Sequence, residues 1–65
     1  MTGKNQIRSE IDKMNKHLDI TMQDLVNVIV LLRDNNLIKE ADYFDTIGQE
    51  LYMIKESLNQ LYSYF

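Results

Sequence analysis

The sequence contains no cysteine, no proline and no tryptophan, and only two glycines, Gly3 and Gly48, among its 65 residues. Without cysteine, the chain can form neither a disulfide nor a thiolate metal site. Strands joined by tight turns normally need several glycines or prolines, so their scarcity argues against an all-β fold. No apolar run approaches the ~18 residues of a membrane span, and residues 1–11 lack the apolar segment of a signal peptide. We therefore expect a helical, cytoplasmic protein that does not enter a membrane.

Positive charge is also scarce, because ten acidic and seven basic residues give a formal net charge of −3. An acidic chain is poorly suited to neutralising phosphate, which disfavours a protein built mainly to bind nucleic acid. Hydrophobic residues make up 45% of the chain and charged residues 26%, a composition typical of a chain that folds. A domain of this size buries only ~60% of the surface that its unfolded chain exposes, so its core is marginal unless a partner completes it.

The apolar residues of the first half recur with the period of an α-helix. Projected at 100° per residue, eight of them fall within an arc of about 80°. They are Ile7, Ile11, Met14, Leu18, Met22, Leu25, Ile29 and Leu32. A phase kept over this whole stretch predicts one helix from about residue 5 to 34. The alternative is a break near residue 20, where Thr21 and Asp24 have the spacing of a helix cap, which would make three helices in all.

Asn35 and Asn36 predict a turn after this helix, because asparagine tolerates the left-handed conformation that ends many helices. A second helix is expected from about residue 37 to 64. From Phe44 its apolar residues occupy two positions of every heptad, as in a coiled coil. They are Phe44, Ile47, Leu51, Ile54, Leu58, Leu61 and Phe65. We expect these side chains to lie in the seam of an antiparallel helical hairpin that forms a single all-α domain over residues 1–65.

A lone hairpin would leave apolar side chains in water. Val26 and Val30 point to one flank of the predicted seam and Leu31 to the other. Burying a side chain such as leucine or valine contributes ~1.5–3 kcal/mol, which favours association. We expect these three residues to form the interface of a homodimer, a four-helix bundle.

Residues that could support catalysis or hold a metal ion are few. His17 is the single histidine, and the sequence contains no phosphate-binding loop, catalytic triad or zinc motif. We therefore predict no enzymatic activity, no cofactor and no metal site. The expected function is to bind another protein as an inhibitor, adaptor or regulator, and the composition is typical of an AT-rich bacterial or phage gene.

The candidate partner-binding residues lie on the second helix, outside its predicted seam. They combine aromatic side chains and methionine with charged residues, the composition of an interface core and its rim. They are Asp42, Tyr43, Asp45, Glu50, Tyr52, Met53 and Tyr64.

An alternative function rests on the first 17 residues, where four basic side chains outnumber two acidic ones. Arg8 and Lys16 lie close together on the surface of the predicted helix, so this end of the chain could form a small basic patch. The alternative is therefore a small nucleic-acid-binding regulator that uses this basic end.

Overall fold

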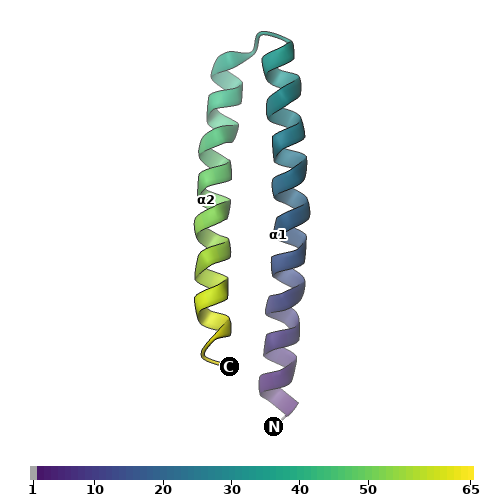
Figure 1. Ribbon diagram of the computed structural model, residues 1–65, viewed down its shortest axis with the longest axis vertical. Helices are drawn as coiled ribbons and strands as arrows, with labels where there is room; N and C mark the ends of the chain where they lie inside the picture. Colours follow the sequence, from purple (N-terminus) through teal and green to yellow (C-terminus); the bar gives the residue numbers. More distant parts are fainter. Residues whose placement is uncertain (1) are drawn as a thin grey trace.

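The computed structural model describes residues 2–65, which form two α-helices and the turn between them. Helix α1 spans Thr2–Asp34 and helix α2 spans Ile38–Tyr62. The helices pack side by side and run in opposite directions, so that both ends of the chain lie at one end of the molecule (Figure 1). There is no strand in the described residues, which confirms the prediction of an all-α hairpin.

Helix α1 is one uninterrupted helix that includes residues 19–21, where a break was the alternative. It has 33 residues against 25 in α2, so its N-terminal end extends past the end of α2 (Figure 1). Over residues 2–65, neither helix combines the length and the apolar character needed to cross a membrane.

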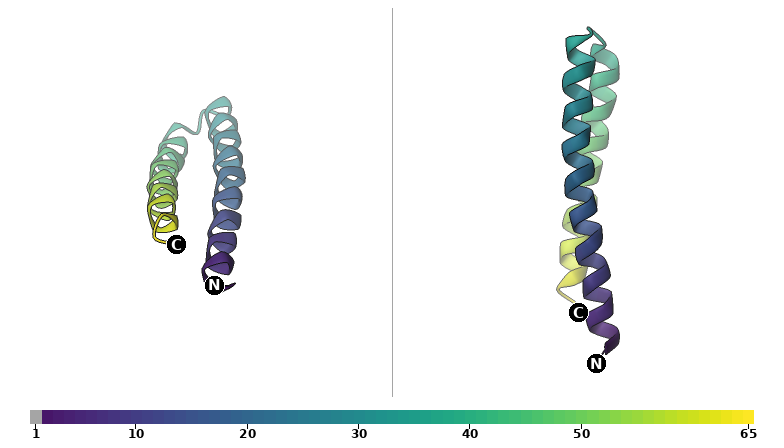
Figure 2. Two further views of the ribbon diagram at one scale, coloured as in Figure 1. Left: turned by 60° about the horizontal axis from the view of Figure 1, so that its bottom comes forward. Right: turned by 90° about the vertical axis from the view of Figure 1, so that its right-hand side faces the viewer.

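The hairpin is a single layer of helices, with Cα dimensions of 53 × 15 × 10 Å. Viewed edge-on, one helix lies behind the other and no further element covers either side (Figure 2). Domains normally bury their apolar side chains between two or more packed layers. Here only Ile11 and Ala41 are buried among the hydrophobic residues that the structure describes. Two long faces of the layer are therefore open to water.

The turn depends on the conformation of Asn36, whose φ of 62° lies in the left-handed region. This conformation lets the N–H of Leu37 donate to the carbonyl of Leu32 at 2.8 Å. The N–H of Asn36 donates to the carbonyl of Arg33 at 3.0 Å, and together these bonds make a Schellman motif. The Asn35 side chain also donates to the carbonyl four residues earlier, at 2.7 Å. Two adjacent asparagines therefore end α1 and reverse the chain without glycine or proline.

The two helices pack through side chains that repeat in heptads. On α1 the buried and half-buried residues are Ile11, Asn15, Leu18, Met22, Leu25, Ile29 and Leu32. On α2 and just past its end, the matching seam residues are Ala41, Phe44, Gly48, Leu51, Lys55, Leu58 and Phe65, and Asp45 beside them is also half-buried. Both sets alternate steps of three and four residues, the spacing of a coiled-coil seam, except for the seven-residue step from Leu58 to Phe65.

Three of the seven residues predicted for the seam of α2 are not in it. Ile47, Ile54 and Leu61 are 42–50% exposed instead of packed against α1. The residues that take their place in the seam are Ala41, Gly48 and Lys55. Relative to the prediction, α2 is rotated about its own axis by roughly 60°.

Small side chains explain this rotation. A Cβ added to Gly48 would lie only 3.0 Å from Cδ2 of Leu25, and Ala41 is completely buried. The backbone of α2 thus approaches α1 closely at two positions one heptad apart, which a bulky residue would prevent. At the third position the long side chain of Lys55 lies along the seam and its ammonium pairs with Asp19.

We expect Gly48→Ala to leave the free energy of unfolding within about 1 kcal/mol of the wild-type value. Alanine gains ~1 kcal/mol in helix propensity, but its Cβ presses on Leu25. Gly48→Leu should lower the free energy of unfolding by about 1–3 kcal/mol, because added bulk forces the helices apart. Urea unfolding at one fixed protein concentration measures both variants. If Gly48→Leu were more stable than wild type, as helix propensity alone predicts, the result would contradict the close approach of α2 to α1 at Gly48.

Candidate protein-interaction surface

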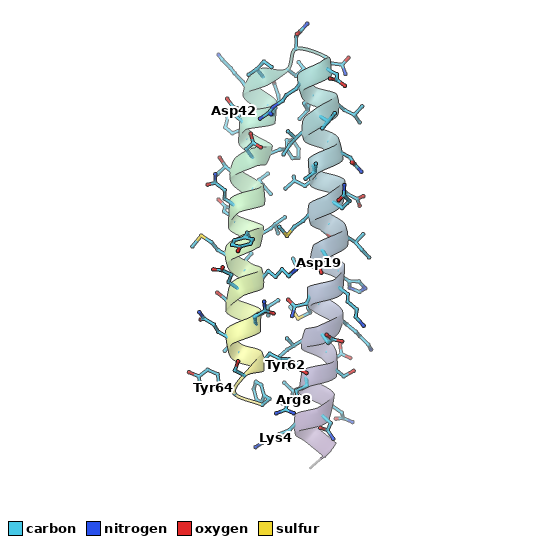
Figure 3. All side chains as sticks on the ribbon, viewed as in Figure 1. Lys4, Arg8, Asp19, Asp42, Tyr62 and Tyr64 are labelled. Carbon is cyan, nitrogen blue, oxygen red and sulfur yellow. The ribbon has the colours of Figure 1, made fainter. Side chains whose placement is uncertain are left out.

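The polar contacts that join the two helices all lie toward one open face when the described side chains are projected along the helix axes. Here this is called the bridged face. Its contacts are the Arg33–Asp45 salt bridge at 2.8 Å, the Lys55–Asp19 salt bridge, the Asn15–Asn59 hydrogen bond at 3.1 Å, and Arg8 at 5.8 Å from the centre of the Tyr62 ring. Arg8 and Tyr62 lie toward each other at the open end of the hairpin, and Asp19 lies near its middle (Figure 3).

The bridged face is hollowed at Gly48, where α2 has no side chain to fill the space between the helices. The hollow has a volume of about 600 Å³. Its lining residues are Met22, Leu25, Val26 and Ile29 of α1, with Asp45, Gly48, Gln49, Tyr52 and Met53 of α2. This is the Gly48 groove, and most of its lining is apolar.

Ion pairs lie at both ends of the Gly48 groove. Arg33 and Asp45 join the helices on the side of the turn, and Lys55 and Asp19 join them on the side of the open end. Between the two pairs, Tyr52 is 55% exposed and borders the apolar floor. The groove therefore combines an accessible apolar centre with a charged rim, as interface patches do.

The structure brings together some of the predicted partner-binding residues and separates others. Asp45, Tyr52 and Met53 line the Gly48 groove. Asp42 and Tyr43 line a different shallow hollow near the turn, and Tyr64 lines one at the C-terminal end. Figure 3 shows Asp42 and Tyr64 at opposite ends of α2. Glu50 is exposed and lines none of these hollows.

The three residues predicted for the dimer interface also lie in different places. Val26 lines the Gly48 groove from α1, and Tyr52 and Met53 line it from α2. Val30 is exposed one helical turn further along α1, beyond the groove. Leu31 is 61% exposed and projects toward the opposite face. Val26 and Tyr52 were assigned to separate surfaces from the sequence, yet they border one groove.

Several residues of the groove were not among the predicted site residues. Met22, Leu25 and Ile29 were assigned to the seam, and they contribute to both the seam and the groove floor. The signal that could have located the groove is Gly48, since a glycine in a heptad leaves a gap on one side of the seam.

The face opposite the bridged face carries exposed aliphatic side chains and is here called the aliphatic stripe. Its residues are Ile7, Met14 and Val28 of α1 and Ile47, Ile54 and Leu61 of α2, all between 37% and 50% exposed. On each helix the members are spaced by seven residues or a multiple of seven, so they form a straight row beside the seam. No polar contact between the helices is found on this side of the described residues.

Three of the four basic residues near the start of α1 are engaged within the hairpin. Lys13 pairs with Glu10 at 3.2 Å, and Lys16 pairs with Asp12 at 3.4 Å. Arg8 lies over the ring of Tyr62. These pairs are exposed and individually weak, but they offset much of the positive charge that a phosphate group would meet.

Neither a metal site nor a similarity to another protein indicates a function for this chain. Among residues 2–65, no three His, Asp or Glu side chains gather closely enough to hold a metal ion. No family model, curated protein or solved structure matches the chain. The candidate surface is therefore defined by its own geometry, an apolar groove on one face and an aliphatic stripe on the other.

Proposed function

We propose that this chain is a small, non-enzymatic protein-interaction module that acts as an inhibitor, adaptor or regulator. Its binding site for another protein is the Gly48 groove. The observation that carries the proposal is an open apolar floor bordered by the exposed side chains of Tyr52 and Met53.

Tyr52 and Met53 supply the anchors of this site. Tyrosine and methionine are enriched at the centre of protein interfaces, where tyrosine gives a large rigid area and methionine adapts to irregular surfaces. Full burial of a large apolar side chain is worth ~1.5–3 kcal/mol, so covering the exposed half of each contributes about 1 kcal/mol. Val26, which is 51% exposed across the groove, adds a similar amount. Three such side chains in one groove make a small but concentrated binding surface.

The groove also sets the shape of the partner. Along α1 it runs from Met22 to Ile29, which is about 10 Å or two helical turns. An amphipathic helix with apolar side chains three or four residues apart would place two of them in such a groove. The ion pairs at either end disfavour a longer apolar segment, because each contains a charge that the segment would leave unsolvated.

Substituting Tyr52 with alanine should weaken binding to the natural partner by at least about 10-fold, since truncation of a hot-spot side chain costs about 2 kcal/mol or more. Met53→Ala should weaken binding in the same direction. The partner is first isolated with the tagged wild-type chain, and its affinity for each variant is then measured by calorimetry with purified proteins.

Tyr43→Ala is the matched control, because Tyr43 is an exposed tyrosine on the same helix outside the groove. This variant should bind the partner like wild type, and all three variants should keep wild-type helicity. Wild-type affinity in both groove variants, with a loss in Tyr43→Ala, would place the site elsewhere on α2.

Self-association into a homodimeric four-helix bundle is part of the same proposal. Its support is the single-layer structure, in which only two of the residues with a described burial are buried and aliphatic side chains remain exposed along both helices. A second hairpin would supply the missing layer. The small size of the chain adds to the argument, since a core of this length rarely stabilises a domain alone.

The competing function is nucleic-acid binding through the basic end of α1, which extends past α2 (Figure 1). Because Lys13 and Lys16 are paired with acids and the chain is acidic overall, we expect no RNA or DNA binding tighter than about 1 μM at physiological salt. Fluorescence anisotropy with labelled oligonucleotides at several salt concentrations measures this. Submicromolar binding that is lost in the Arg8→Ala, Lys16→Ala variant would favour the competing function.

A further inference from the structure

The aliphatic stripe is not explained by the Gly48 groove, which lies on the opposite face. Its residues alternate between the two helices along about 30 Å of the hairpin, at 1.5 Å per residue. The middle of this stretch coincides with the middle of the hairpin, near the pair Asp19–Lys55. Because the stripe is centred on the hairpin, the stripes of two stacked hairpins overlap along their full length whether the hairpins run in the same direction or in opposite directions.

Both the size and the chemistry of this face suit a second copy of the chain. A face of 53 by 15 Å covers roughly 800 Å², the area that each partner contributes to a standard protein interface. Its residues are isoleucine, leucine, valine and methionine at heptad spacing, as in the inner layers of a four-helix bundle. It lacks the tyrosine and the ion pairs that border the Gly48 groove.

Charge selects the orientation of the second copy. In the half of the hairpin near the turn, residues 18–54, seven acidic and two basic residues give a formal charge of −5. In the open half, residues 2–17 and 55–65, five basic and three acidic residues give +2. Three of the acids near the turn, Asp24, Glu40 and Glu50, are exposed and lie along or beside the stripe. Two hairpins that point the same way would bring these acids together, whereas opposite directions pair acidic halves with basic halves.

We infer that two copies of this chain pack through their aliphatic stripes in opposite directions, with the turn of each beside the open end of the other. This inference rests on the dimer proposed above and moves its interface from Val26 and Val30 to the opposite face. Leu31, which projects in nearly the same direction as Ile20 and is 61% exposed, lies outside this interface. The two Gly48 grooves then lie on the outer surfaces of the dimer, so each dimer binds two partner molecules.

Ile54→Ser and Ile20→Ser make a matched pair of variants that tests the face. Both isoleucines lie near the middle of the hairpin and are about half exposed, but Ile20 points away from the stripe. Sedimentation equilibrium should show that Ile54→Ser raises the dimer dissociation constant by at least about 10-fold, because two aliphatic contacts are lost per dimer. Ile20→Ser should leave the constant unchanged. The reverse pattern, or a dimer indifferent to Ile54→Ser, would overturn the inference.

The relative orientation of the two hairpins is tested separately, in a variant whose aliphatic stripe is unchanged. Because the chain has no cysteine, Lys39→Cys provides a unique site for a spin label near the turn. Hairpins in opposite directions place the two labels about 50 Å apart. Hairpins in the same direction place them within about 30 Å, given the spacing of packed helices. A dominant short distance would overturn the inferred opposite orientation without contradicting the dimer. Partner binding through Tyr52 is measured independently, because Tyr52 lies on the other face.

Discussion

The close approach of α2 to α1 at Ala41 and Gly48 determines which side chains of this hairpin are buried. Helices with side chains of equal size could pack through several of their faces. Because Ala41 and Gly48 lie one heptad apart on the same side of α2, one face of α2 allows the closest approach to α1. Leu25 lies 3.0 Å from where a Cβ of Gly48 would be. Packing on that face gains contact along the whole seam, and it turns α2 so that a row of large aliphatic residues is left outside.

The two open faces follow from this packing. On one side, the gap at Gly48 leaves an apolar groove between the Arg33–Asp45 and Lys55–Asp19 pairs. On the other side, the side chains displaced from the seam form the aliphatic stripe. A single layer of two helices does not cover either surface. The differences between them in chemistry suit different occupants, a second copy for the uniform aliphatic row and another protein for the groove with its tyrosine and charged rim.

The sequence alone predicted the helices, their antiparallel arrangement and the asparagine turn, because each depends on local pattern and on residues such as Asn36. It did not predict the rotation of α2. By hydrophobicity alone, Ile47 and Ile54 are better candidates for the seam than Gly48. Gly48 lies in the seam instead because it allows the two helices to fit closely together. The Gly48 groove was not predictable from the sequence for the same reason. Val26 and Tyr52 line one groove, whose existence depends on how the two helices face each other, and periodicity within one helix does not specify this.

The central claim is that this hairpin is half of a folded unit and depends on a second layer for its stability. The most direct test is the thermal unfolding of the wild-type chain over a hundredfold range of protein concentration, with the mass measured by sedimentation at each concentration. The account predicts a mass of twice 7.7 kDa and a Tm that rises with concentration, because dimerisation stabilises only the folded state. A monomeric mass together with a cooperative transition whose Tm is independent of concentration would contradict it.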